Sequence, residues 1–259
     1  MFFNTLKSEW TKLRSTASFW WTTGLVFVIS VGVAAIITSA GNSADTAGTE
    51  GAVSMGASPF VLTMPFTTVG LPILLIQAIM VVTTEYRFGL VPQNFLATPT
   101  RWPVLLAKFV LYAVIAAVIS FLVVVLSYLV SQLLQSGDTA NLTSPFEDEM
   151  GKRLLWAIPL ATVVAVLFVQ GLGMLVRQTA GAVAITIIWL LGFDQFLRLI
   201  PKAGDDIAKT MPFQNMNNFL RDMPFEGTEW SSWSSLGVFA LWAVVAWVAG
   251  LLLTLKRDA

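Results

Sequence analysis

Long stretches without any charged side chain constrain the fold of this chain more than any other feature. No charge occurs between Arg14 and Asp45, and none occurs between Glu50 and Glu85. A helix needs roughly 20 mostly apolar residues to cross the hydrocarbon core of a bilayer. Only 12% of the residues are charged, whereas a soluble domain has roughly 25%. We therefore predict an all-α integral membrane protein.

Six stretches are long enough, or nearly long enough, to be transmembrane helices of one transmembrane domain covering residues 1–259. We expect the spans at about residues 19–38, 60–83, 104–134, 154–176, 180–200 and 236–255. The fifth is short, because only 16 uncharged residues separate Arg177 from Asp194. At about 1.5 Å per residue they give roughly 24 Å of helix, against a hydrocarbon core of roughly 30 Å.

Asp194 and Arg198 stand four residues apart at the end of this short span, on a helix expected to continue to Ile200. Opposite charges at this spacing can pair on one face of a helix. We expect a salt-bridged anchor at the extracellular membrane surface; a role in substrate exit is the alternative. The extracellular segment 201–235 mixes charges with aromatic residues. This composition predicts short helices at the membrane interface.

Residues 1–18 are predicted to form an amphipathic helix before the first span. The apolar side chains recur at helical spacing, with most basic residues elsewhere on the wheel: Phe2, Phe3, Leu6, Trp10 and Leu13. This pattern is typical of a helix that lies in the membrane interface. A solvated basic tail before the first span is the alternative.

The second span contains Pro65 and Pro72, seven residues apart and so on nearly the same face, followed by Gln77. Prolines in a span free backbone carbonyls that hydroxyls, water or neighbouring helices must satisfy. We expect a kinked, locally polar span, with these three residues as candidates for a translocation path. A purely structural kink is the alternative for either proline.

Residues 84–103 are a polar, charged and aromatic segment between the second and third spans. Its charges cannot remain in hydrocarbon, so the segment must emerge on one face of the membrane. Aromatic anchors among charges can fill a groove on a soluble partner, and an interfacial loop is the alternative. Lys108, in the first turns of the third span, is expected to protrude or to extend to the headgroups.

The distribution of basic residues predicts the orientation. Six spans place both termini and segment 84–103 on one side, which carries nine of the 15 Lys and Arg residues. The opposite side carries the other six, in longer and more acidic loops. Because basic residues near the spans favour the cytoplasmic face, we expect both termini and this segment to be cytoplasmic.

Four groups of residues stand out in order along the chain: Leu-Lys-Ser-Glu-Trp-Thr-Lys-Leu-Arg-Ser at 6–15, Glu-Tyr-Arg-Phe-Gly at 85–89 with Leu-Ala-Thr-Pro at 96–99, Arg-Gln-Thr-Ala-Gly-Ala at 177–182 and Met-Pro-Phe-Gln-Asn at 211–215. Together they resemble the permease subunits of type-2 ATP-binding-cassette transporters, especially those of actinobacteria. The resemblance covers nearly the whole chain and rests on the ordered combination, since no single motif is specific.

The resemblance implies six spans after an interfacial helix, with a coupling helix between spans two and three that docks on a separate ATPase. It also implies that spans two and five line an interface between two permease subunits. The coupling residues implied by position, together with the aromatic Tyr86, are Glu85, Arg87, Gly89, Asn94, Phe95, Leu96, Pro99 and Arg101. Leu90 replaces the family's usual threonine and Pro92 follows, so the docking helix is expected to start later or to bend.

Several absences limit the chemistry of the chain itself. It has no cysteine and no histidine, which excludes thiol nucleophiles and imidazole acid-base chemistry. It has no basic run of the kind that binds nucleic acid, and no phosphate-binding G-x-x-x-x-G-K-[ST] loop. We therefore expect no catalytic or metal site here, with ATP and Mg²⁺ bound by the partner ATPase.

The leading hypothesis is a permease subunit that exports an apolar or amphipathic substrate across the bacterial plasma membrane. Its expected partners are separate ATPase subunits, a second permease that is either a copy or a paralogue, and membrane lipids. The alternative is a membrane anchor or sensor that recruits a cytosolic partner without transport. An intramembrane enzyme ranks third, because Asp194, the only acid inside or near a span, has a ready partner in Arg198.

Overall fold

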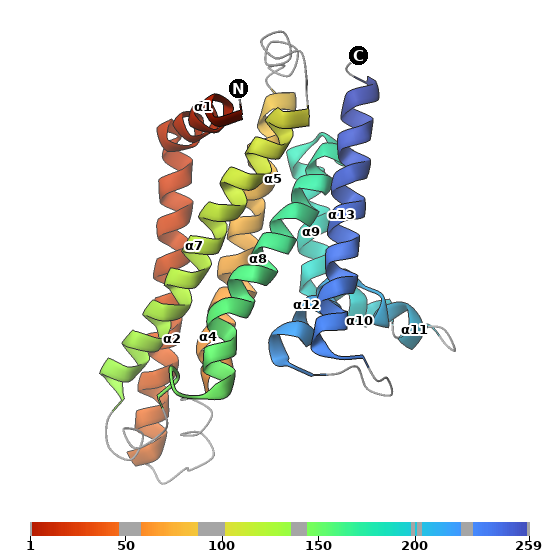
Figure 1. The fold of residues 1–259 in the computed structure, drawn as a ribbon. Helices are drawn as coiled ribbons and strands as arrows, with labels where there is room; N and C mark the ends of the chain where they lie inside the picture. Colours follow the sequence, from red (N-terminus) through yellow and green to blue (C-terminus); the bar gives the residue numbers. More distant parts are fainter. Residues whose placement is uncertain are drawn as a thin grey trace. The chain divides into compact units, whose positions relative to one another are not determined.

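The computed structural model describes residues 2–46, 58–87, 102–135, 144–197, 200, 204–223 and 230–257, and no strand occurs among them (Figure 1). The helices that begin and end the chain are α1 (Phe2–Ser15), α2 (Ala17–Thr46) and α13 (Ser232–Arg257). Between them lie α4 (Pro59–Pro65), η1 (Phe66–Gly70), α5 (Leu71–Arg87), α7 (Trp102–Leu134), α8 (Glu149–Val176), α9 (Thr179–Ile188), η3 (Trp189–Phe193), α10 (Asp194–Leu197), α11 (Gly204–Lys209) and α12 (Pro212–Arg221).

Five of these helical stretches are long and apolar enough to cross a membrane: Ala17–Asn42, Pro59–Tyr86, Trp102–Leu134, Glu149–Val176 and Ser232–Lys256. Each contains one of the predicted spans. The prediction of an all-α, multi-span membrane protein is therefore confirmed at the level of these five helices.

The stretch predicted as the fifth span is not one continuous helix. α9 passes into the π-helical turn η3, where Gly192 has a φ of 112°. Glycine adopts this left-handed conformation without the steric penalty of a Cβ atom. The expected uninterrupted helix to Ile200 is thus broken at Gly192, and its apolar part, Thr179–Phe193, is shorter than the five long helices.

The second span departs from regular α-helix between its two prolines, as their spacing predicted. The π-helical turn η1 separates α4, which ends at Pro65, from α5, whose second residue is Pro72. The hydroxyls of Thr67 and Thr68 both donate to the Met64 carbonyl, at 3.1 and 2.7 Å. Side-chain hydroxyls therefore supply hydrogen bonds beside the interruption, which lets an apolar segment tolerate it.

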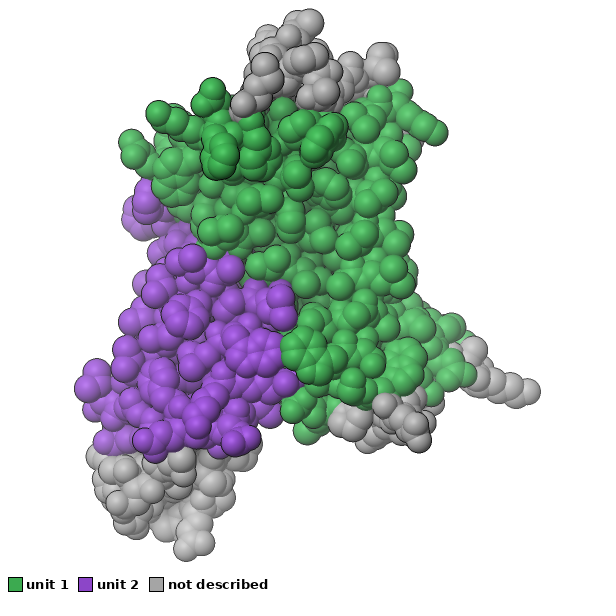
Figure 2. Space-filling view, viewed as in Figure 1, with its two compact units in different colours: residues 1–19, 75–116, 161–259 green, residues 20–74, 117–160 purple. Residues whose placement is uncertain are grey.

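Contacts group the chain into two compact units, coloured separately in Figure 2. Unit 1 comprises residues 1–19, 75–116 and 161–259, and unit 2 comprises residues 20–74 and 117–160. Within unit 2, Thr38 on α2 donates to Ser131 on α7 at 3.1 Å, and the Asn42 side chain donates to the Leu134 carbonyl at 2.6 Å. Such hydroxyl and amide bonds hold apolar helices together where burial against lipid gives little driving force.

Within unit 1, α8 and α13 approach until backbone touches backbone. A Cβ atom added to Gly171 would lie 2.5 Å from the Trp247 nitrogen, and one added to Gly250 would lie 2.9 Å from the Gly171 carbonyl. Glycines allow this close approach because they carry no side chain. The absence of a side chain at Gly171 and Gly250 therefore permits the close contact between α8 and α13.

The segment after η3 forms the predicted short helices α11 and α12. α12 packs against α13, and its Phe213 ring contacts Phe168 of α8 and Phe239 of α13 at centroid distances of 5.7 and 6.0 Å. Aromatic pairs at such distances add to the stabilisation from burial itself. α12 is thus a packed part of unit 1.

Candidate functional site

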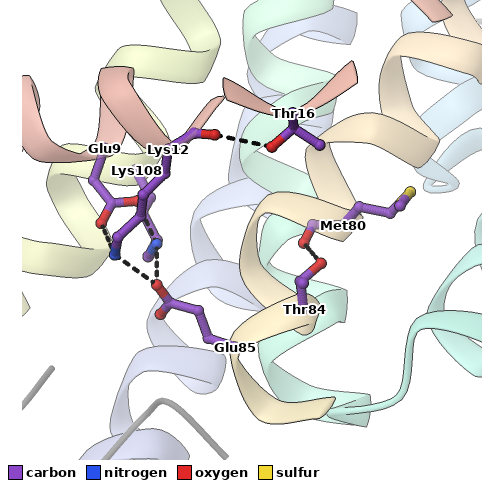
Figure 3. Close-up of polar contacts among 7 residues, drawn as sticks. All are labelled: Glu9, Lys12, Thr16, Met80, Thr84, Glu85 and Lys108. Atoms are coloured by element: carbon purple, nitrogen blue, oxygen red, sulfur yellow. Dashed lines mark hydrogen bonds and ion pairs between the residues drawn. The ribbon is translucent and has the colours of Figure 1, made fainter. Parts of the chain in front are cut away.

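Four charged side chains from three separate helices form one cluster in unit 1 (Figure 3). Lys108 Nζ, on α7, lies 2.5 Å from Glu9 Oε2 on α1 and 2.6 Å from Glu85 Oε1 on α5. Lys12 Nζ, one helical turn after Glu9, lies 2.8 Å from Glu9 Oε1 and 3.3 Å from Glu85 Oε1. Each lysine therefore bridges the same two carboxylates.

The cluster is buried on one side and open on the other. The Lys108 side chain is only 2% exposed, Glu9 6% and Glu85 15%, whereas Lys12 is 48% exposed. Taking charges out of water is costly unless opposite charges and hydrogen bonds replace the lost hydration. The two positive and two negative charges balance, which explains how three nearly buried ions coexist here.

Burial and charge act in opposite directions on the two cluster members of α1. Burial tends to raise the pKa of Glu9, but Lys108 and Lys12 outweigh it, so this pKa lies below its ordinary value of 4.5. Burial tends to lower the pKa of Lys12, but Glu9 and Glu85 outweigh it, so this pKa lies above its ordinary value of 10.5. Glu9 and Lys12 are therefore both charged throughout the physiological pH range.

A second polar group lies about two turns before Glu85 along α5. Gln77 Nε2 donates to the Phe19 carbonyl at 3.1 Å, and Gln77 Oε1 accepts a bond of 2.7 Å from the Tyr112 hydroxyl. The buried Gln77 amide thus joins α5 to the start of α2 and to α7. Both ends of this amide have protein partners, as burial requires.

A pocket of about 330 Å³ extends between the charged cluster and Gln77. Its lining comes from α1, the start of α2, α5 and Lys108 of α7: Glu9, Lys12, Leu13, Thr16, Ser18, Phe19, Gln77, Met80, Val81, Thr84, Glu85 and Lys108. Figure 3 shows Lys12, Thr16, Thr84 and Glu85 around this space. The volume is at the lower end of the range of about 300–1,000 Å³ that is usual for small-molecule sites.

The last turns of α5 and α13 meet at the same end of unit 1. The Tyr86 and Thr254 hydroxyls are hydrogen-bonded at 2.9 Å, and the Arg177 guanidinium lies over the Tyr86 ring, 5.1 Å from its centroid. Arg177 also donates to the Leu253 carbonyl at 3.3 Å. Because α1 and α7 contact Glu85 and α13 contacts Tyr86, α1, α7 and the last turns of α5 and α13 lie near one another in unit 1 (Figure 1).

Only part of the predicted coupling segment falls within the described residues. Glu85 and Tyr86 are in α5 and face protein partners, and Arg87 is the last residue of that helix. The other predicted coupling residues lie outside the described residues: Gly89, Asn94, Phe95, Leu96, Pro99 and Arg101. Their docking role stays a prediction.

Of the three residues predicted for a translocation path, Gln77 lines the pocket beside the cluster, whereas Pro65 and Pro72 do not. Asp194 begins α10, but its side chain and all of Arg198 lie outside what the structure describes. The path and the anchor pair therefore also stay predictions.

Sequence reasoning missed Glu9, Lys12 and Lys108 as site residues. The expectation that Lys108 extends to the headgroups is wrong, because its ammonium group is buried between two carboxylates. One signal was present in the sequence: Glu9 and Glu85 are two of only three acids on the predicted cytoplasmic side. Isolated acids among many bases near span ends are candidates for internal ion pairs.

No protein-family model matches the chain, and no curated protein matches it.

Proposed function

We propose that this chain is the permease subunit of a bacterial ATP-binding-cassette exporter in the plasma membrane. The observation that carries the proposal is the four-residue ionic cluster. Glu85 belongs to the helix before residues 88–101 and Lys108 to the helix after them, and both side chains are tied to α1. A partner that pushes on the intervening segment therefore acts on three helices at once.

The resemblance to type-2 permeases supplies the kind of partner. ATP-driven closure of the separate ATPase subunits pushes on segment 84–103, and the cluster transmits this movement to α1, α5 and α7. Buried, hydrogen-bonded ion pairs suit this role better than exposed ones, which contribute only about 0–1 kcal/mol and are easily broken. ATP and Mg²⁺ are bound by the partner, since this chain has no phosphate-binding loop.

The geometry refines the role of Glu85 within this proposal. Its carboxylate is engaged by Lys12 and Lys108, so it faces the permease itself. We assign Glu85 to transmission and leave docking to the residues after Arg87, with Phe95 and Leu96 as apolar anchors. Pro65, Pro72 and Gln77 remain the candidates for the path of an apolar or amphipathic substrate.

The remaining assignments follow the charge distribution and the resemblance. Both termini and segment 84–103 are cytoplasmic, because the side they share carries nine of the 15 basic residues. The functional unit contains two permease subunits, either two copies of this chain or this chain with a paralogue.

The test combines Phe95→Ala with Leu96→Ala and follows the ATPase that co-purifies with the chain. We expect the double variant to remain folded in the membrane but to lose the ATPase, because two apolar anchors are removed. Met223→Ala is the control, since Met223 is an exposed apolar residue on the opposite, predicted extracellular, side. Undiminished co-purification in the double variant would contradict the docking assignment. If a stable complex shows no substrate-stimulated ATP hydrolysis in vesicles, the anchor alternative is favoured.

A further inference from the structure

The pocket of unit 1 has a polar end and an apolar body, arranged along one face of α5. The α5 residues that line it follow the spacing i, i+3, i+4, i+7 and i+8, and so share one side of the helix: Gln77, Met80, Val81, Thr84 and Glu85. Eight residues of helix correspond to about 12 Å. The pocket thus runs from the charged cluster toward the apolar part of the span.

The apolar part of the pocket is lined by a large, exposed side chain, that of Met80. Met80 is 38% exposed, and Leu13 and Val81 beside it are half-buried. In a helix that crosses a membrane, such an apolar surface is suited to contact with hydrocarbon. An unbranched chain fits beside Met80, whose thioether adapts its shape to its neighbours.

The polar end offers one accessible positive charge. Lys108 is enclosed by both carboxylates, whereas nearly half of the Lys12 side chain is exposed. The Thr16 hydroxyl, also on the pocket wall, donates to the Lys12 carbonyl at 2.9 Å, which leaves its oxygen able to accept a further bond. A ligand that places an anionic group beside Lys12 and an apolar chain beside Met80 matches both ends.

We propose that this pocket binds one phospholipid of the surrounding bilayer, with its phosphate beside Lys12 and the upper part of one acyl chain along Met80 and Val81. The exposed aromatic residues Phe3, Trp10 and Trp102 border the same end of unit 1. Such residues gather at the level of the lipid headgroups. The phosphodiester is the anionic group found at that level, and Lys12 is the half-exposed cation of the pocket lining that can meet it.

The bound lipid fills the space between α1 and α5 and so holds the interfacial helix against the span. Binding of this lipid requires only that the chain is inserted in a membrane, with or without an ATPase, so its test is independent of the transport experiments.

Native mass spectrometry of the chain in dodecyl maltoside, titrated with dioleoyl phosphatidylglycerol, tests the site. We expect one lipid retained per chain. Lys12→Gln should weaken retention about fivefold, because one basic residue near the headgroup is lost. Lys7→Gln is the matched control, since Lys7 is exposed on the same helix and does not line the pocket.

A second pair of variants tests the apolar body without changing charge. Met80→Trp should abolish retention by filling the pocket, whereas Met64→Trp should leave it unchanged, because Met64 is equally exposed at 38% but lies outside the pocket. Gel filtration and helical circular dichroism check that each variant is folded. Equal retention by the two tryptophan variants, or equal loss in the two lysine variants, overturns the proposal. Displacement of the lipid by millimolar inorganic phosphate also overturns it, because the site would then recognise phosphate alone.

Discussion

Removing the buried lysine of the ionic cluster should destabilise the protein strongly. Lys108 is 2% exposed and contacts two carboxylates, at 2.5 and 2.6 Å. Deleting one partner of a buried ion pair costs about 3–5 kcal/mol, because the other charge stays buried without compensation. Lys12 still pairs with both carboxylates in Lys108→Met, at 2.8 and 3.3 Å. We therefore expect a loss of about 3 kcal/mol in the free energy of unfolding, at the low end of that range.

The assay is reversible unfolding of the purified chain by sodium dodecyl sulfate in mixed micelles, followed by helical circular dichroism. Lys209→Met is the control: Lys209 pairs with the exposed Asp206 at 3.1 Å, and such a surface pair is worth less than about 1 kcal/mol. Combining Lys108→Met with Glu9→Gln and Glu85→Gln should recover part of the loss, because neutral replacement of a whole buried cluster is often tolerated. The reasoning is refuted if Lys108→Met costs no more than Lys209→Met, or if the triple variant is less stable than the single one.

Three further predictions concern the same unit. Stability should be flat between about pH 5 and pH 10. The pKa of Glu9 is lowered, so the stability that Glu9 contributes is lost as the pH falls below 4.5 through that pKa. The pKa of Lys12 is raised, so the stability that Lys12 contributes is lost as the pH rises above 10.5. A pH titration of the unfolding midpoint checks both limits, and a steady slope around pH 7 argues against them. Gly171→Ala should lower the free energy of unfolding by about 1–3 kcal/mol, because the added Cβ forces α8 away from α13. Gly237→Ala is the control: nothing lies within 4 Å of its added Cβ, so it should stabilise the protein by up to about 1 kcal/mol. Equal unfolding midpoints of the two variants would disprove the contact. Tyr86→Phe removes the hydrogen bond to the Thr254 hydroxyl and should lower the free energy of unfolding by about 1 kcal/mol in the same assay. An unchanged free energy of unfolding would mean that water replaces this bond.

The spans could be predicted from the sequence because membrane insertion depends on the summed hydrophobicity of a local segment. The interruption of the second span was predictable for the same reason, since Pro65 and Pro72 act on their own helix. The break at Gly192 was not foreseen. A glycine in an apolar run has several structural meanings, and its left-handed backbone is known only from the structure.

The ionic cluster could not be predicted, because it depends on contacts between distant parts of the chain. Lys108 pairs with Glu9, 99 positions away. A charge near a span end can extend to headgroups or pair inside the protein, and its sequence context is the same in both cases. Glu85 was selected for its place in the coupling segment, yet its structural role comes from Lys12 and Lys108. Tyr86 likewise turns toward Thr254 and Arg177.

Photo-crosslinking from the coupling segment tests the central claim most directly. A photoreactive amino acid at Asn94, in the chain expressed in its native bacterial membrane, should yield an adduct with a protein that contains a phosphate-binding loop and hydrolyses ATP. The same group at Trp230, in the predicted extracellular segment, should give no such adduct. An adduct only with lipid at Asn94, or the same ATPase captured from Trp230, would contradict the account.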